Sequence, residues 1–292
     1  MSNFFQHVVI GLSSGGIYAS LALALVLVYR ATRVINFAQG EMAMFCTFIA
    51  WSLLDRGLPY WGAFFATLAI AFAGGVALER VVIRPLEGGP TLTIVMVTIG
   101  LLIGLNGAAF WIWGGEPKSF PSAFSTRTVH VGGVVFSVQD AGTIAVTLGA
   151  VVLLWLFFRY TKLGLAMRAS AVNPEESRLV GVRVGWMLAF GWGLAAVLGA
   201  VSGMLAAPSL FLDPNLMRPV IIYAFAAAVL GGLDSPVGAV VGGLLLGVGL
   251  ELLTTYVDAL AGLQLPVALA IIVAVLLVRP AGLLGRPAVS RV

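Results

Sequence analysis

The sequence predicts an all-α integral membrane protein, a bundle of about eight to ten transmembrane helices. Of its 292 residues, 60% are hydrophobic and only 10% are charged, whereas a typical soluble domain has about 25% charged residues. The apolar residues occur in runs long enough to cross ~30 Å of hydrocarbon. Short polar segments with Arg, Pro and Gly separate these runs. We therefore expect lipid to surround most of the protein surface. We also expect one transmembrane domain over residues 1–292.

Nine apolar runs are the expected membrane spans, and some are expected to be short or broken. The two runs between residues 219 and 256 are compatible with two short helices or with one re-entrant pair, and the run that begins near Asn36 is compatible with a broken helix. The expected spans are 8–29, 37–54, 60–79, 91–113, 141–158, 185–206, 219–233, 236–256 and 264–278.

The first run is expected to stay in the membrane as a helix. A cleavable signal peptide would begin with a basic segment, but the first basic residue, Arg30, follows the apolar run. The single cysteine, Cys46, lies inside the second run, where we expect a buried, small apolar side chain. No disulfide within the chain is therefore expected.

The basic residues predict the orientation, because segments on the cytoplasmic side of a membrane are enriched in Lys and Arg. If the N-terminus lies outside and nine spans alternate, twelve of the sixteen Lys and Arg fall on inner segments. The N-terminus is thus predicted outside and the C-terminus inside. The twelve are Arg30, Arg33, Arg80, Arg84, Arg159, Lys162, Arg168, Arg178, Arg183, Arg279, Arg286 and Arg291.

Glycines four residues apart occur in five pairs within the expected spans. This spacing places both glycines on one helix face and lets another backbone approach closely, which indicates a tight bundle rather than a particular function. The pairs are Gly11 and Gly15, Gly100 and Gly104, Gly199 and Gly203, Gly238 and Gly242, and Gly243 and Gly247.

Motifs for catalysis and metal binding are missing from the sequence. No glycine-rich phosphate loop precedes a lysine, so we expect no ATP hydrolysis by this chain. His7 and His130 have no Cys or His neighbours at metal-binding spacing, and both are expected near the outer surface, away from acidic partners. We therefore expect a protein that is not an enzyme, holds no metal or cofactor and binds no nucleic acid.

A short capped helix is predicted in the polar segment 159–183. Asn173 is a good N-cap and Pro174 is favoured at the first helical position. Glu175 and Glu176 complement the positive end of the helix dipole, and Gly181 is a suitable C-terminal stop. About two helical turns are expected here.

Such a short helix is stable only when it packs on something. Leu179 and Val180 give it a small apolar face, next to the polar Arg178. Two interpretations stay open from the residues alone: the helix lies on its own bundle, or it docks on a soluble cytoplasmic partner.

A polar signature opens the second run. Asn36, Gln39 and Glu41 enter an otherwise apolar segment, and Gly40 allows a local break. A carboxylate at membrane depth is costly unless it is paired or near water. One interpretation is a capped helix start at the inner interface, with Glu41 near the positive end of the dipole. The other gives these four residues a role in a translocation pathway or its gate.

The chain closely resembles the H-type inner-membrane permease subunit of bacterial branched-chain amino-acid ABC importers. The likeness covers nearly the whole chain in ordered blocks. These are GLSSGGIYASLALALVLVY at 11–29, INFAQGEMAM at 35–44, IRPLEGGPTLTIVMVTIGL at 83–101, GLAMRASAVNPEESRLVGV at 164–182, AFAAAVLGGLDSPVGAVVGG at 224–243 and VRPAGLLG at 278–285.

The resemblance implies a division of labour in the bacterial inner membrane. A periplasmic binding protein would deliver the solute, this chain and a second permease subunit (a heterodimer) would form the pathway, and two ATP-binding subunits would drive it. The segment from Asn173 to Gly181, with Arg178 and Leu179, resembles the coupling helix that docks on an ATPase subunit. The outer segment 114–140 would face the binding protein.

Three positions depart from the family pattern. Gln39 stands where His is usual, which argues against a titrating group there, Glu87 where a basic residue is common, and Asp234 where a tight turn often has Gly. Because related permeases serve urea, short-chain amides and other amino acids, these remain alternatives to branched-chain amino acids. A self-sufficient secondary transporter, with Glu41 as its acidic group, and a membrane scaffold are the competing classes.

Overall fold

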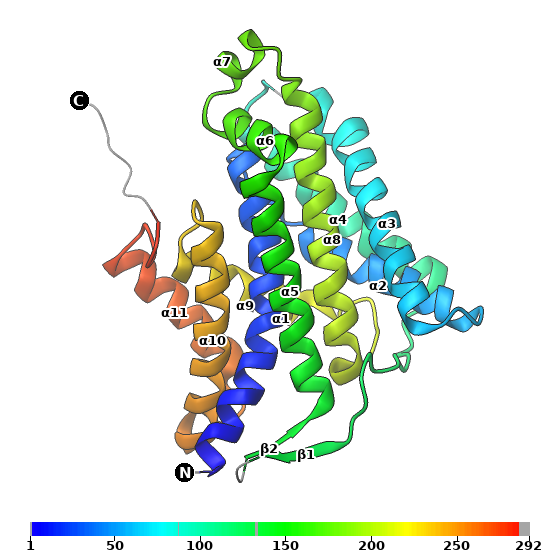
Figure 1. The fold of residues 1–292 in the computed structure, drawn as a ribbon, viewed down its shortest axis with the longest axis vertical. Coiled ribbons are helices and arrows are strands. Elements are labelled where there is room, and N and C mark those ends of the chain that lie inside the picture. Colours follow the sequence, from blue (N-terminus) through cyan, green and yellow to red (C-terminus); the bar gives the residue numbers. More distant parts are fainter. Residues whose placement is uncertain (1, 87, 132–133, 286–292) are drawn as a thin grey trace.

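The computed structural model of the protein describes residues 2–86, 88–131 and 134–285. Within them the chain folds into a bundle of α-helices with one small β-hairpin (Figure 1). The elements are α1 (Ser2–Thr32), α2 (Gln39–Asp55), α3 (Tyr60–Leu78), the π-helix η1 (Glu79–Ile83), the 3₁₀ turn η2 (Arg84–Leu86), α4 (Thr91–Trp113), β1 (Thr128–Val131), β2 (Val134–Ser137), α5 (Val138–Tyr160), α6 (Lys162–Val172), α7 (Pro174–Leu179), α8 (Val184–Leu210), α9 (Met217–Gly231), α10 (Pro236–Tyr256), the 3₁₀ turn η3 (Asp258–Leu260) and α11 (Gln264–Val278).

The membrane-spanning character of the fold is confirmed. Six of the described helices are long and apolar enough to cross a bilayer, namely α1, α3 with its η1 and η2 extension, α4, α5, α8 and α10. The apolar α9 and α11 are shorter, at 15 residues each, and α2 has 17 residues. Since a straight crossing takes about 20 residues, the expectation that some spans are short fits these three helices.

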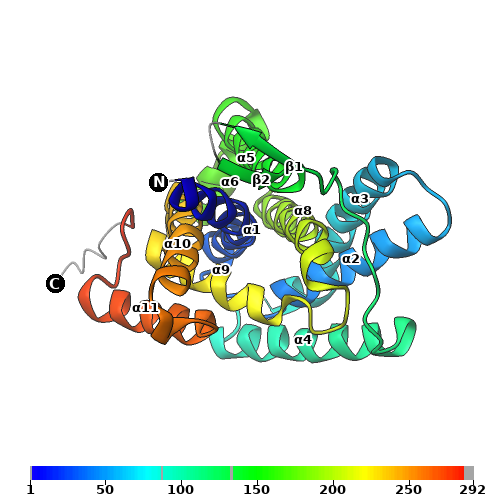
Figure 2. The ribbon, with the colours of Figure 1, turned by 90° about the horizontal axis from the view of Figure 1, so that it is seen from below.

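The core of the bundle is formed by α1 and α8. Their most apolar windows are 61% and 67% buried, whereas those of α4 and α5 are only 11% and 17% buried. Figure 2, seen along the bundle, shows α1 and α8 inside and α4 and α11 at the rim. The Ser202 hydroxyl of α8 donates a hydrogen bond of 3.1 Å to the Ile17 carbonyl of α1. The two central helices are thus in direct contact.

Glycines allow the close approach of α1 and α10. A Cβ added at Gly247 would lie 2.3 Å from the Cα of Gly15, and one at Gly243 would lie 2.5 Å from the Cα of Ala19. Both distances are below any real Cβ contact. The pair Gly11 and Gly15 therefore faces the pair Gly243 and Gly247, as the predicted close packing requires.

The same expectation is wrong for Gly100 and Gly104 within this chain. A Cβ added at either residue of α4 would meet no atom within 4 Å. The spacing of glycines reveals which face of a helix they share, but not whether another helix lies against that face. The other two pairs do pack: Gly203 lies against Thr47 of α2, and Gly242 lies against the Ala227 carbonyl of α9.

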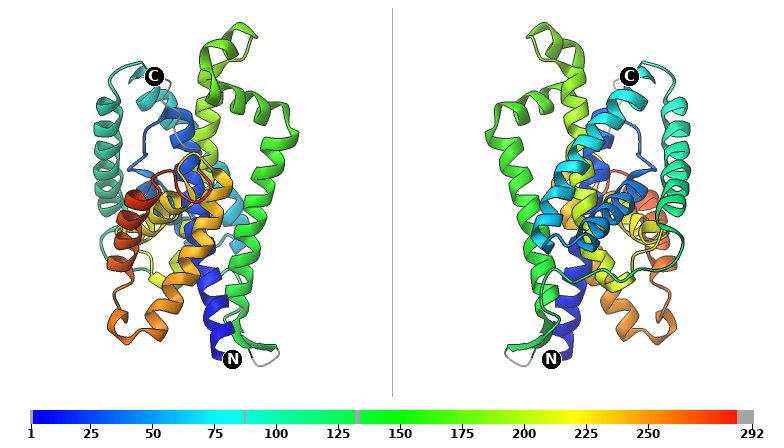
Figure 3. Two further views of the ribbon diagram at one scale, coloured as in Figure 1. Left: turned by 90° about the vertical axis from the view of Figure 1, so that its left-hand side faces the viewer. Right: turned by 90° about the vertical axis from the view of Figure 1, so that its right-hand side faces the viewer.

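Two elements in the polar segments were not expected. Residues 114–140 contain an antiparallel hairpin in which Thr128 pairs with Ser137, and α5 begins with a capping box between Ser137 and Asp140. Lys118 also forms a backbone bridge with Leu212, with N–O distances of 2.8 and 2.9 Å. The segment 159–183 holds α6 in addition to the predicted α7, and Figure 3 shows α6 crossing from the end of α5 toward α8.

The helices alternate in direction along the bundle. The N-terminus lies at one end, and α7 lies at the other (Figure 1). We call these the N-terminal end and the α7 end. The end of α1, the start of α4 and the start of α8 all lie toward the α7 end (Figure 1). If nine spans alternate as predicted, most Lys and Arg lie on this side. Arg286, Arg291 and Glu87 lie outside the described residues.

Candidate functional site

The start of α2 is tied to α8 by a buried amide network. The Asn36 side chain accepts a hydrogen bond from the Ala38 N–H (3.1 Å) and donates one to Gln39 Oε1 (3.2 Å). Gln39 Nε2 in turn donates to the Ala195 carbonyl of α8 (3.0 Å). Asn36 and Gln39 are 1% and 0% exposed. Gly199 makes the approach possible, because a Cβ there would lie 2.9 Å from Gln39 Nε2.

Glu41 belongs to a different polar group on the other side of α2. Its Oε2 accepts a hydrogen bond of 3.2 Å from Asn106 of α4, and the same Asn106 amide donates to the Pro214 carbonyl at 2.7 Å. Arg218, at the start of α9, is an exposed positive charge in the same region. Glu41 is 5% exposed. A partly buried cluster therefore joins α2, α4 and the α8–α9 connection, with Arg218 exposed at its edge.

The residues of the polar signature thus lie close in sequence but contact different neighbouring helices. Successive helical residues are rotated by about 100°, so Gln39 meets α8 while Glu41 meets α4. Gly40 lies against α9, because a Cβ there would be 3.2 Å from the Cβ of Ile221. The interpretation of a simple helix start explains only part of this arrangement: Glu41 is in the first turn of α2, yet it is buried and bonded to another helix.

Asn106 is the residue of this cluster that the sequence analysis missed. The signal was present, since Asn106 is a lone amide in the apolar span 91–113. A polar side chain in such a span needs a partner in the bundle. Which partner it finds depends on how α4 packs, and this is information that a single sequence lacks.

Three connections are held together by polar contacts: the α1–α2 link, the α9–α10 turn and the segment after α11. The link between α1 and α2 contains Arg33, which has a left-handed φ of 58°. Its guanidinium lies 2.7 Å from the carboxylate of Asp234 in the α9–α10 turn. Asp234, which departs from the family pattern, thus takes part in an ion pair on the surface. The N–H groups of Leu283 and Leu284 donate to the carbonyls of Leu230 and Gly231 at the end of α9, at 2.8 and 3.0 Å.

The predicted short helix is present as α7. The Asn173 side chain accepts a hydrogen bond of 3.2 Å from the Glu176 N–H, Pro174 occupies the first turn, and Gly181 has a φ of 84°. Two large apolar side chains that follow the first turn are uncovered. Leu179 is 87% exposed and Val180 is 79% exposed. These two side chains therefore do not pack on the rest of the described chain, whereas Ser177 of the same helix is buried at 4% exposure, so both interpretations stay open.

A basic pocket adjoins α7. It has a volume of about 380 Å³ and is formed by η2, the end of α7, the start of α8 and the residues between these two helices. Three arginines line it, namely Arg84, Arg178 and Arg183. The polar surroundings of α7 are therefore strongly positive on this side.

The expectation that both histidines lie far from acidic groups is wrong for His7. Its Nδ1 lies 3.0 Å from Glu251 Oε1, because α1 and α10 run side by side. The Thr255 hydroxyl also approaches Nδ1, at 3.3 Å. A nucleophile–His–acid relay uses the two different ring nitrogens, so this cluster has the wrong geometry for one. Among the described residues, no three His, Cys, Asp or Glu form a metal-binding group.

The buried Cys46 agrees with its prediction, as it is 8% exposed and unpaired. Taken together, the fold and these clusters define an all-α, multi-pass membrane protein whose polar residues connect helices in its interior. The sequence model of the family described as "Branched-chain amino acid transport system / permease component" matches residues 7–278. The chain belongs to this family.

Curated relatives extend over nearly the whole chain. It is 34% identical to the high-affinity branched-chain amino acid transport system permease protein BraD of Pseudomonas aeruginosa, over 99% of this chain and 98% of that protein. It is 31% identical to the permease protein LivH of the corresponding system of Escherichia coli K12, with the same coverage of both chains. A probable LivH of Methanocaldococcus jannaschii is also 31% identical, over 91% of this chain and 87% of that protein.

Proposed function

We propose that the chain is the membrane-spanning permease subunit of an ABC importer that translocates branched-chain amino acids. The observation that carries this proposal is near-full-length similarity to permease proteins of branched-chain amino-acid systems, with no large region of the chain left over. The work of transport would come from separate ATP-binding subunits, and a periplasmic binding protein would deliver the solute. A second permease subunit, different from this one, would complete the pathway.

The exposed apolar residues of α7 support its role as a coupling helix. Apolar side chains facing water at the tip of a helix cost free energy that a partner surface removes, at about 25 cal/mol per Å² covered. Leu179 and Val180 are uncovered at the α7 end, away from the rest of the bundle. The proposed docking surface comprises Asn173, Pro174, Glu175, Glu176, Arg178, Leu179 and Gly181. It would contact one ATP-binding subunit in the cytoplasm.

The cluster of Glu41, Asn106 and Arg218 is the proposed wall of the pathway or part of its gate. Asn36, Gln39 and Gly40 would support it, because they fix α2 against α8 and α9. In this role Glu41 would act through its hydrogen bond with Asn106, which joins α2 to α4 beside the path. Differential binding of ATP to two states of the assembly would open and close this path.

Transport by the assembled complex tests the proposal. The tagged chain is purified from native membranes together with the subunits that accompany it, reconstituted into liposomes and supplied with the binding protein. We expect ATP-dependent uptake of labelled leucine, isoleucine or valine, and none of urea or acetamide. ATP-dependent uptake of urea alone would assign another substrate to the same subunit. Uptake driven by an ion gradient without any copurified subunit would contradict the proposal and favour a self-sufficient transporter.

A further inference from the structure

A cavity on the flank of the bundle has one apolar and one basic end. It has a volume of about 430 Å³ and lies between α1, α5, α6, α8 and α10. Apolar side chains form most of its wall, and several of them are exposed: Val152 is 52% exposed, Trp155 is 47% exposed and Val237 is 58% exposed. The cavity therefore opens sideways from the helices, where lipid tails surround a membrane protein.

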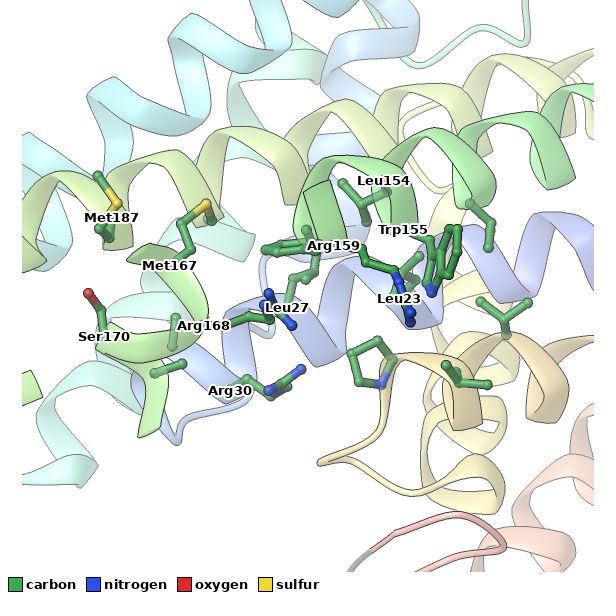
Figure 4. A pocket seen from close by; sticks show the side chains of 18 of the residues that line it. Leu23, Leu27, Arg30, Leu154, Trp155, Arg159, Met167, Arg168, Ser170 and Met187 are labelled. Carbon is green, nitrogen blue, oxygen red and sulfur yellow. The ribbon is translucent and has the colours of Figure 1, made fainter. Parts of the chain in front are cut away.

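Three arginines from different helices reach into the cavity. Figure 4 shows the side chains of Arg30, Arg159 and Arg168 directed toward the same space. Arg30 is near the end of α1, Arg159 is near the end of α5, and Arg168 is in α6. None of the described residues that line the cavity is acidic. Arg159 and Arg168 thus bring two positive charges to this end, and no described lining residue carries a negative one.

The position of this charge matches the boundary between hydrocarbon and headgroups. Arg159 lies over the rings of Trp155 and Tyr160, at 5.3 and 5.7 Å from the ring centroids. Trp and Tyr gather at the interface of a membrane, and long basic side chains extend toward it from helix ends. A molecule in the cavity would have its anionic part at the interface and its apolar part along α5 and α10.

We propose that the cavity binds one anionic phospholipid, with the phosphate on Arg159 and Arg168 and the acyl chains along Val152, Trp155 and Val237. A soluble anion would use only the basic end and would leave the apolar wall uncovered. A neutral lipid would offer Arg159 and Arg168 no net negative charge. Basic pockets between transmembrane helices bind anionic lipid headgroups in general.

Lipid enrichment tests the site in the full-length chain within its purified complex. The complex is placed in nanodiscs in which phosphatidylcholine is in excess over phosphatidylglycerol, and the lipids retained after extraction into detergent are counted by native mass spectrometry. We expect retained phosphatidylglycerol well above its bulk share. The double variant R159Q/R168Q should lower this enrichment about tenfold, because two basic contacts are lost.

Two further variants separate the cavity from general surface charge. R56Q/R127Q, which removes two arginines from the outer segments, should keep the enrichment of the unmodified chain. V152W, which fills the apolar end, should lower the enrichment although all arginines remain. Equal loss in R56Q/R127Q, or full enrichment in V152W, would overturn the proposal, as would unchanged enrichment in R159Q/R168Q.

Discussion

At the scale of single residues, the Glu41–Asn106 contact is one of the contacts that attach α4 to the bundle, beside the hydrogen bond from Trp113 to Ser52. α4 is mostly uncovered within the chain, with only 11% of its most apolar window buried. The Asn106 amide satisfies both the Glu41 carboxylate and the Pro214 carbonyl. Leaving a buried acceptor without its donor costs about 1–3 kcal/mol. This one side chain is therefore important for keeping α4 in place.

The first prediction separates the hydrogen bond of Glu41 from its charge. Glu41→Gln keeps an oxygen that accepts from Asn106, so we expect uptake and protein level close to those of the unmodified chain. Asn106→Leu removes the donor from two buried acceptors, so we expect a lower thermal midpoint in detergent and less uptake. Uptake of labelled amino acid, normalised to the amount of chain in the membrane, measures both. Loss of uptake in Glu41→Gln at a normal protein level would show that the charge itself is needed, with Arg218 as its counterpart.

The polar signature of α2 shows how far sequence reasoning reaches for single residues. Asn36, Gln39 and Glu41 were recognised as unusual because polar groups in an apolar run need partners. Their partners, Ala195 and Asn106, lie on helices more than sixty residues away. A single sequence shows that a polar side chain needs a partner, but it does not show which helix provides that partner. The division into two clusters was therefore not predicted.

At the scale of elements, α7 was predicted well because its signals are local. An N-cap, a proline in the first turn and a glycine stop all act within one or two turns. α6 was missed because, with 11 residues, it is too short for a membrane span and it lies in a segment rich in charged residues. The β-hairpin was missed for a related reason, since two strands of four residues are stabilised by their pairing and by the bundle.

The second prediction concerns α7. Replacing Leu179 and Val180 with Asp should weaken the binding of the ATP-binding subunit by about tenfold or more, because central apolar contacts contribute most of the energy of such interfaces. Insertion of the chain should remain normal, since both side chains are exposed. Copurified ATPase activity per chain is the measurement. The same charge added at Ser125 and Thr126, in the outer segment, serves as the control; normal coupling in the α7 variant would refute the docking role.

The third prediction concerns the close contact of α1 and α10. Gly247→Ala should destabilise the bundle by about 1–3 kcal/mol or more, because the added methyl group meets the backbone of α1. Gly104→Ala is the matched control on α4, where a Cβ meets no atom within 4 Å. The fraction of chain that stays monodisperse after heating in detergent compares the two. Equal tolerance of both substitutions would contradict the tight α1–α10 contact.

At the scale of the whole molecule, the fold class and most spans followed from the sequence. The predicted spans at 91–113, 236–256 and 264–278 agree with α4, α10 and α11. These boundaries were accessible because hydrophobic length and polar interruptions are imposed directly by the bilayer. The arrangement of helices was not accessible, because any apolar face packs on lipid as readily as on another helix.

The fourth prediction concerns orientation. Basic residues predict that the α7 end faces the cytoplasm and the N-terminal end faces outward. In a chain with Cys46→Ala, a cysteine at Ser125 should react with a membrane-impermeant maleimide on intact spheroplasts. A cysteine at Glu175 should react only after the membrane is opened. The reverse pattern would invert the orientation and remove α7 from the reach of any cytoplasmic partner.

α8 connects the two ends of the bundle. One end follows α7, and the other precedes Leu212, whose backbone is paired with Lys118 of the outer segment. A helix of 27 residues is about 40 Å long. α8 packs on α1, α2 and α3, so we expect it to move as one unit up to Pro208. A tilt of about five degrees, driven at α7, would shift the opposite end by about 3 Å. A displacement applied on one side of the membrane would thus reach the other side by rotation of α8 as a unit, without unfolding of any segment.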